Sequence, residues 1–381
     1  MLAISSLGST DVLSAQASPD LVPMPATIAE AYRTTQADPA LSDEEKIKAT
    51  IDAYFNVGYL ERQQGRGVDF ASVISAQTAD KSWLQSERDR RDILIAQTAL
   101  RLKFVSFAYT LTYSSIQIEK EFATATLAES HEVVFEVSSP EVSKMAGLVH
   151  EVRLHRDVDG WRLVADKYQD ELSQLMATTP KSQILAAIEH ERQVMLRGSS
   201  SSTVQASHAR LLPALSVHGY NRSAAASYAD TWWNTANSAF NYYAGNNCTN
   251  YTSQAVYMGS NQTQSSGSGA NDWHFKPDTG PWIRVAEFNT WINTNTGRGP
   301  YGVGTSQCDV AVGDVIQLQQ YGYDWYHGVI VVAITAPRAE QCINKGVILI
   351  DSNTINRWHY PLSSYAGVTQ YRWIKIAGWR D

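Results

Sequence analysis

A cysteine at the start of a predicted helix is the residue in this chain best placed to do chemistry. The segment "GNNCTNYTSQAVYMG", residues 245–259, puts Cys248 where a turn of Gly and Asn gives way to a helical pattern. A thiol attacks a carbonyl only as the thiolate, and a helix N-terminus supplies the positive potential that lowers a thiol pKa. Cys248 is therefore a candidate nucleophile. Half of a disulfide and a small buried apolar residue are the two other interpretations.

A thiolate nucleophile needs a histidine within reach as its general base. His274 falls in the predicted loop "NDWHFKPD", His359 precedes a predicted turn, and His218 lies on the boundary of the C-terminal half. His327 begins the apolar segment "HGVIVVAIT", a predicted strand that pairs with "GDVIQL" as a hairpin and can hold an imidazole rigidly. We expect His327 to be the base, although a hydrogen-bonded core histidine is the simpler interpretation.

A third polar group should orient the imidazole, and the next predicted strand, "ILIDSNT", is the neighbour that could supply it. Strand alternation places Ile348 and Ile350 on one face and Asp351 and Asn353 on the other. Asn353 is the preferred third member and Asp351 the alternative. Asn353 could also simply shape a turn.

The elements that precede this site follow a different order. Residues 27–100 show helical spacing, with Ser42 as the cap of the first long helix. From residue 103 the pattern alternates between apolar and polar residues, and residues 157–160 form a hairpin-turn signal. Helices followed by an antiparallel meander predict an α+β fold with helices packed on a curved sheet. This order, with its ending "DGWRLVADKYQDEL", resembles the SnoaL-like, cystatin-like domains.

Length and charge predict two domains. The chain has 381 residues, too many for one ordinary domain. Residues 1–200 carry 20 Lys and Arg against 28 Asp and Glu, or −8, whereas residues 201–381 carry 11 against 10, or +1. We expect a leader or signal-like segment at 1–25, a SnoaL-like domain at 26–178, a helix and Ser-rich linker at 179–219, and a second domain at 220–381.

Composition excludes some classes of function and favours a location. A net charge of −7 without a basic cluster argues against a nucleic-acid partner, and no apolar run is long enough to span a membrane. The first residues contain an A-x-A-like stop at 15–17, typical of a signal-peptide cleavage site, but lack a basic start. A truncated signal and a flexible leader both fit. We expect a secreted or cell-wall-associated protein of undetermined oligomeric state.

The C-terminal half resembles a known family. The segments "YNRSAAASYADTWW", "NNCTNYTSQAVYMGS", "WIRVAEF", "VGDVIQL" and "HGVIVV" are similar to the "putative amidase domain", a family related to papain-like CHAP and NlpC-type cysteine peptidases. The resemblance covers residues 220–365 and implies a papain-like domain, with the cysteine at a helix N-terminus beside an antiparallel sheet. It implies Cys248 as nucleophile and His327 as base. The chain departs from the family at Asn247, usually Asp, and at Asn353, usually His.

The resemblance also implies a mechanism, which is hydrolysis of an amide through a thioester acyl-enzyme. The backbone N–H of Cys248, helped by Asn246 or Asn247, would bind the oxyanion. Aromatic residues are candidates for a peptide or glycan groove, although most tryptophans in such a domain are simply core. The groove candidates are Tyr243, Trp273, Trp282 and Trp325, with Tyr242 and Tyr326 beside them.

The two other cysteines flank the predicted central hairpin. Cys308 precedes "DVAVGDVIQL" and Cys342 follows "VVAITAPRAE", so the hairpin should bring them together as a disulfide and leave Cys248 free. Three buried thiols are the alternative. No CxxC, HxxxH or HExxH spacing is present, and we expect no metal and no cofactor.

The sequence therefore predicts a cysteine amidase or peptidase that acts on an amide bond, with peptide or peptidoglycan as its substrate class. Cell-wall peptide is indicated only by the family resemblance. One alternative is an acyltransferase or transglutaminase that uses the same Cys–His pair. The other is an inactive module that binds the cell wall or a protein.

Overall fold

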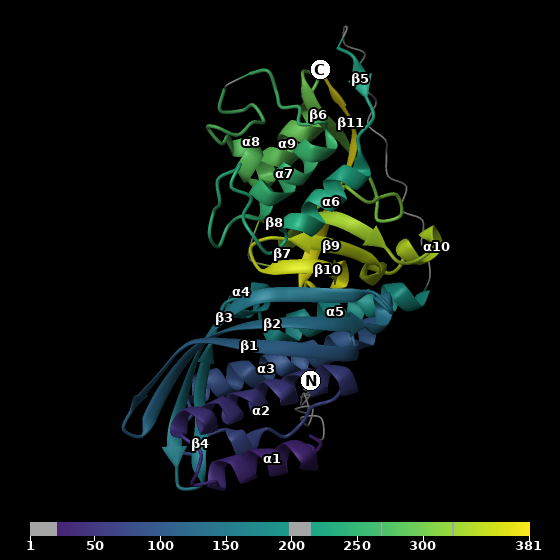
Figure 1. The fold of residues 1–381 in the computed structure, drawn as a ribbon. Helices are drawn as coiled ribbons and strands as arrows, with labels where there is room; N and C mark the ends of the chain where they lie inside the picture. The colour runs from purple at the N-terminus through teal and green to yellow at the C-terminus, as the bar shows by residue number, and fades with distance from the viewer. Residues whose placement is uncertain (1–20, 198–214, 268, 322–323) are drawn as a thin grey trace, which may run out of the picture.

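The protein is a long antiparallel sheet with helices packed along it, as Figure 1 shows. The computed structural model describes residues 21–197, 215–267, 269–321 and 324–381. Most of the predicted leader and nearly all of the Ser-rich segment lie outside these residues. The predicted α+β class is confirmed. In the described part of the chain, no helix combines the length and apolar character needed to cross a bilayer.

The N-terminal half forms helices and then a meander, as its two sequence periods predict. Ser42 starts the longest helix with a capping box, in which its hydroxyl accepts from the Glu45 N–H while the Glu45 carboxylate accepts from the Ser42 N–H. The elements are α1 (Ala26–Ala37), α2 (Asp43–Gln64), η1 (Ala71–Val73), α3 (Lys81–Gln97), η2 (Thr98–Leu100), β1 (Phe104–Glu119), β2 (Phe122–Phe135), η3 (Glu136–Ser138), β3 (Val142–Asp157), β4 (Gly160–Lys167), α4 (Glu171–Thr178) and α5 (Lys181–Arg197).

The C-terminal half contains the predicted helix, which begins at Cys248, and the predicted β7–β8–β9 ladder. The helix before it ends at Trp232, where the chain turns. The elements are β5 (Val217–His218), α6 (Arg222–Trp232), α7 (Cys248–Gly259), α8 (Gly280–Ile283), α9 (Val285–Thr294), β6 (Gly299–Gly304), β7 (Val315–Gln320), β8 (Trp325–Ile334), α10 (Arg338–Gln341), η4 (Lys345–Val347), β9 (Ile348–Ser352), β10 (Asn356–Pro361), η5 (Leu362–Ser364) and β11 (Val368–Arg380).

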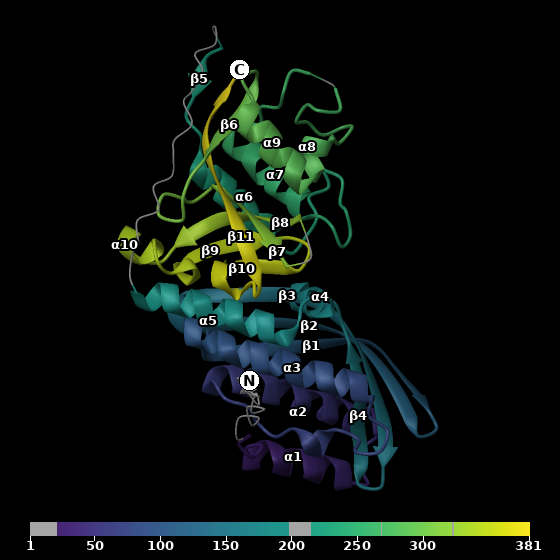
Figure 2. The ribbon, with the colours of Figure 1, turned by 180° about the vertical axis from the view of Figure 1, so that it is seen from behind.

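One sheet runs through both halves. The strand order is β1-β2-β3-β10-β9-β8-β7-β11-β5, with β4 on β3 and β6 on β11. The junction is the antiparallel pair β3–β10, which matches Asn356 with Ala146 and Trp358 with Lys144. Figures 1 and 2, which are opposite views, both show β10 of the C-terminal half lying beside the N-terminal sheet. Nothing in the sequence predicts this pairing.

Two apolar cores lie on opposite faces of the C-terminal strands. Helices α6 to α9 cover one face, where Ile330 and Leu349 pack against Trp273 and Trp282. The other face belongs to a core that continues into the N-terminal helices and includes Val329, Ile350 and residues of α2 and α5. The division into domains at 26–178 and 220–381 stays a prediction, but the two parts share a sheet and a core.

Candidate active site

Cys248 is the first residue of α7, and the structure gives it the properties of a reactive thiol. It is free, and the residue is only 3% exposed. Burial alone would raise the pKa of the thiol, but the charge and hydrogen bond of His327, helped by the Gly328 N–H and the Thr249 hydroxyl, lower that pKa to about 7. A sizeable fraction of Cys248 is therefore thiolate at neutral pH.

His327 lies near the start of β8 and is held from its far side by a phenol. Its Nε2 is 3.2 Å from Tyr365 Oη, and Tyr365 Oη donates to Ser352 Oγ at 3.1 Å. Ser352 Oγ in turn donates to the Ile355 carbonyl at 3.2 Å. Because the phenol proton goes to Ser352, Tyr365 accepts from His327 Nε2–H. This tautomer leaves His327 Nδ1 unprotonated and able to accept a proton.

The position beside the imidazole is thus occupied by Tyr365 and not by Asn353. The strand register explains this, because Val331 pairs with Ile350 and Ile330 pairs with Asp351. Side chains two residues apart share a face, so residues 327, 329 and 331 lie on one face and 351 and 353 on the other. The predicted alternation along β9 is right, but it places Asn353 on the helical side, away from the imidazole.

Asn353 and Asn247 instead tie the start of α7 to the sheet. Asn247 Nδ2 donates to Asn353 Oδ1 at 2.9 Å, and Asn353 Nδ2 donates to the Trp232 and Trp233 carbonyls at 3.4 and 3.0 Å. Both residues are buried, at 4% and 2% exposure. Their amides therefore hold the helix terminus that carries Cys248, which is a positioning role.

The predicted oxyanion donors are only partly available. The Asn247 amide is engaged, because its Oδ1 accepts from Asn250 Nδ2 at 2.8 Å and from the Tyr243 N–H at 3.2 Å. Asn246 is exposed, and its N–H donates to the Tyr243 carbonyl. The N–H of Cys248 is in the first turn of α7, where backbone donors have no intrahelical acceptor. This N–H remains the best-placed oxyanion donor.

Asp351, the alternative third member, belongs to a separate buried cluster. Its Oδ1 accepts from the His359 N–H at 2.7 Å, and His359 Nε2 lies 2.8 Å from Asp230 Oδ1. Burial, with the nearby Asp230 carboxylate, holds the pKa of Asp351 well above its usual range. The three residues offer atoms within 4.8 Å of one another, a spacing that could hold a cation. A proton shared between the two carboxyl groups satisfies the same geometry.

The predicted groove aromatics have different environments. Trp273 and Trp282 are fully buried in the core under α6 to α9, so they do not line a groove. Their residue type alone made them candidates, but their indole N–H groups bond to buried Ser253 and Asn250. Tyr243 is half-buried and donates through its hydroxyl to Asp278. The Arg372 guanidinium lies 3.8 Å from the centre of the Trp325 ring.

An open groove of about 1080 Å³ lies beside the start of α7. Tyr242 and Thr354 are among its lining residues, and the Thr354 hydroxyl accepts from the Asn247 N–H at 3.2 Å. Its opposite wall comes from β3 and α3 of the N-terminal half, including Leu148 and Arg90. The groove therefore runs between the two halves of the chain.

Cys308 and Cys342 form a disulfide, as their positions around the β7–β8 hairpin predict. The bond joins residues 34 positions apart and closes the loops at one end of the hairpin. The chain has three cysteines, and Cys248 is the one that this disulfide leaves as a free thiol.

Comparison with known proteins supports an amidase-type domain in the C-terminal half. Residues 219–376 match the family model described as "Putative amidase domain". An uncharacterized protein of Bacillus subtilis (strain 168), YjcM, is 31% identical over 114 residues, which are 30% of this chain and 25% of that protein. The chain thus spans about a quarter of that relative's length.

Similar solved structures resemble only part of the chain. Kfla4162 from Kribbella flavida is 18% identical and covers 33% of this chain and 91% of its own, with a TM-score of 0.24. A function unknown protein from Mycobacterium tuberculosis is 15% identical and covers 39% of this chain and 92% of its own, with a TM-score of 0.23. TM-scores this low support no structural conclusion.

Proposed function

We propose that the protein is a cysteine-dependent amidase or peptidase that hydrolyses amide bonds. The observation that carries the proposal is the Cys248–His327 hydrogen bond at the start of α7, with the thiol pKa lowered to about 7. The match of this region to an amidase family supports the same reaction class. Tyr365 takes the orienting role for which the sequence suggested Asn353.

The reaction follows from the order of the hydrogen bonds. His327 Nδ1 takes the thiol proton, and the Cys248 sulfur attacks the amide carbon while the Cys248 N–H binds the oxyanion. The carbon–nitrogen bond then breaks as His327 returns the proton to the leaving amine, giving a thioester and a free amine. Water, deprotonated by His327, attacks the thioester and releases the acid and the thiol.

The substrate class is proposed from the groove and the family match. A groove with both polar and apolar walls suits an extended peptide, and one of its lining residues, Thr354, accepts a hydrogen bond from the residue before Cys248. The proposal includes cell-wall peptide as the substrate, and secretion or association with the wall. They rest on the family resemblance.

Alkylation of the native protein with iodoacetamide as a function of pH tests the nucleophile directly. Cys248 is free while Cys308 and Cys342 are bonded, so the modified peptide is unambiguous in mass spectrometry. We expect a labelling midpoint near pH 7. Replacing His327→Ala should move the midpoint up toward the value of about 8.5 for an ordinary thiol. A midpoint at that higher value in the unaltered protein would remove the basis for the proposal.

Hydrolysis is then assayed on a peptide library and on muropeptides, with Cys248→Ala as the inactive control. Release of amine that depends on Cys248 supports hydrolysis. If an added amine replaces water as acyl acceptor, the protein is an acyltransferase. Binding to walls without turnover, together with an unreactive Cys248, would make it a binding module.

A further inference from the structure

A second site lies away from Cys248, in a cavity between the halves of the chain. The cavity has a volume of about 170 Å³. Its walls come from α2, α3 and β3 on one side and from β10 and the segment after it on the other. It meets the open groove, because Leu148, Tyr168 and Arg90 line both. A small molecule therefore has a path from solvent to the cavity.

Most charged groups around this cavity have a partner of opposite charge. Arg90 forms a two-bond ion pair with Asp170, and Arg357 pairs with Glu171 at 2.9 Å. Arg91 is paired in the same way, with Glu61 at 2.9 Å. The two charges of each pair cancel, so these pairs leave little net charge to attract a ligand.

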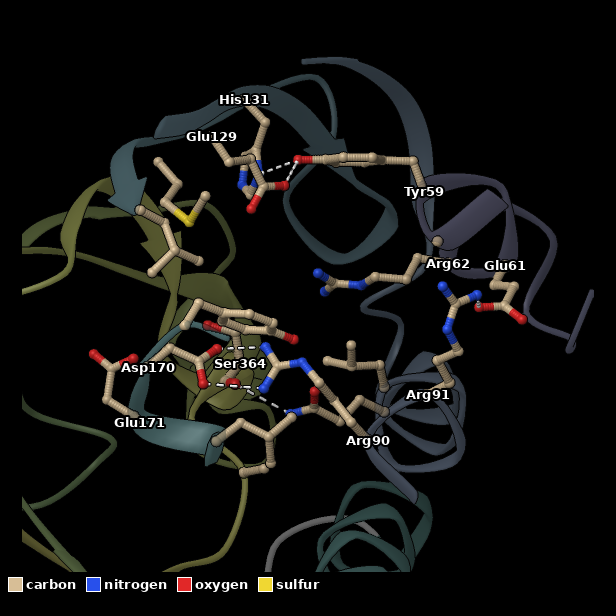
Figure 3. A pocket seen from close by; sticks show the side chains of 18 of the residues that line it. Tyr59, Glu61, Arg62, Arg90, Arg91, Glu129, His131, Asp170, Glu171 and Ser364 are labelled. Carbon is tan, nitrogen blue, oxygen red and sulfur yellow. Dashed lines mark hydrogen bonds and ion pairs between the residues drawn. The ribbon is translucent and has the colours of Figure 1, made fainter. Parts of the chain in front are cut away.

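Arg62 is the exception. It forms no ion pair with any carboxylate of the described residues, and its Nε is buried without a hydrogen-bond partner. The groups that it contacts are neutral, namely the Phe104 ring at 4.1 Å and the hydroxyl of Tyr360, and the charge of Arg90, which also acts on it, is of the same sign. Figure 3 shows its guanidinium between the Tyr59–His131 group and the Arg90–Asp170 pair, pointing into the cavity. A cation inside the fold without a counter-ion is costly, and an anion from solution would remove that cost.

The rest of the wall shows what kind of anion fits. Apolar side chains of Phe55, Leu94, Met145, Leu148 and Leu172 face the same space. The volume slightly exceeds the cavity of about 150 Å³ that accepts a benzene ring in an engineered protein core. Arg357, which also lines the cavity, has Nε and Nη1 without acceptors among the described residues.

We propose that this cavity binds a small organic monocarboxylate, with the carboxylate against Arg62 and an apolar body of about one ring or six carbons against the apolar wall. A guanidinium binds a carboxylate through two parallel N–H bonds, which suits this anion better than a spherical one. The site does not depend on Cys248 and stands apart from the proposed hydrolase activity.

Calorimetric titration of the full chain with benzoate, phenylacetate and hexanoate tests the proposal. We expect at least one acid to bind, and its neutral amide to bind at least about tenfold more weakly, because a charged hydrogen bond is lost. Inorganic phosphate should bind more weakly than the best acid, since it has no apolar body. Failure of all three acids to bind, or equal binding of acid and amide, overturns the proposal.

Two variants locate the site, and a third serves as the control. Arg62→Met should weaken binding of the best acid at least about tenfold without lowering the melting temperature, because it removes an uncompensated charge. Leu148→Trp should block the path between groove and cavity. Arg33→Met, on the exposed face of α1, should change neither property. Unchanged binding in both Arg62→Met and Leu148→Trp would show that the acid binds elsewhere.

Discussion

The N-terminal half of the molecule buries charges, whereas the surroundings of Cys248 bury neutral polar groups. Around the cavity, the arginine side chains other than Arg62, and the His150 side chain, are matched to carboxylates inside the fold. Around the thiol, a phenol, a serine hydroxyl and two amides are joined in chains of neutral hydrogen bonds. The buried ionic groups are Arg91 with Glu61 and Glu87, Arg90 with Asp170, and His150 with Glu129 and Asp166.

This difference suits the two halves to different roles, which are a pH-dependent fold in the N-terminal half and the orientation of the imidazole at Cys248. Buried ion pairs fix geometry but contribute little net stability, and they make the fold sensitive to pH. The hydrogen bonds that orient the imidazole join neutral groups, and the one cation against them is the Arg357 guanidinium, 4.5 Å from the centre of the Tyr365 ring and paired with Glu171. We infer that the N-terminal half responds to pH and to ions, while the chemistry at Cys248 is set mainly by local geometry.

The largest expected effect concerns His150 in the charged half. Burial opposes its charge, but hydrogen bonds to Asp166 and Glu129 raise the pKa of His150 to about 9, above the unfolded value of about 6.5. Its stabilisation is therefore complete below about pH 6.5 and is lost as pH rises through about 9. The free energy of unfolding should fall by on the order of 3 kcal/mol over this interval, as measured by urea denaturation.

His150→Gln should flatten that pH dependence and be most destabilising near pH 6. His190→Gln, an exposed histidine of α5, is the matched control and should leave the profile as it is. A profile that stays steep in His150→Gln would mean that another group carries the alkaline loss.

The second effect concerns the neutral amides. Asn353→Ala should leave Asn247 Nδ2 and the Trp232 and Trp233 carbonyls without their buried partner. We expect a loss of about 1–3 kcal/mol in unfolding free energy, again by urea denaturation. The labelling midpoint of Cys248 should rise less than in His327→Ala, since Asn353 holds the start of α7 through Asn247 and is not among the groups that lower the pKa of the thiol. A large upward shift of that midpoint would restore Asn353 as the third catalytic member.

The smallest effect concerns Tyr365. Tyr365→Phe removes the acceptor of His327 Nε2–H and should cost about 1 kcal/mol, or roughly fivefold in the rate of Cys248 alkylation at pH 7. The midpoint should rise by less than about one pH unit, because the imidazolium loses its partner. Tyr360→Phe, which alters a phenol away from His327, is the control. Identical alkylation profiles for the two variants would deny Tyr365 a positioning role.

Local patterns predicted the elements of the site well. The turn before Cys248, the β7–β8 hairpin and the Cys308–Cys342 bond depend on residues close in sequence or at the ends of a single hairpin. Short-range signals of this kind are visible in a sequence, and each appears in the structure.

The sequence did not predict Tyr365 as the partner of His327, because this contact depends on long-range strand pairing and not on a short-range signal. Tyr365 follows a short turn, and its approach to the imidazole depends on the register of β8 and β9, which places residues 327 and 352 on the same face. A period of two identifies the two sets of residues along a strand but not which set faces a neighbouring group. The unpaired Arg62 was hidden likewise, because its isolation results from long-range packing.

The β3–β10 junction has a consequence for anyone who wishes to produce the C-terminal half alone. A gene trimmed to residues 219–376 would leave the edge of β10 without a partner and expose the apolar residues that α2 and α5 cover in the whole chain. Unpaired strand edges and exposed apolar faces associate with other chains, so we expect such a product to aggregate into inclusion bodies. The sequence match is confined to residues 219–376, whereas the sheet and the apolar core that cover these residues extend through the N-terminal half.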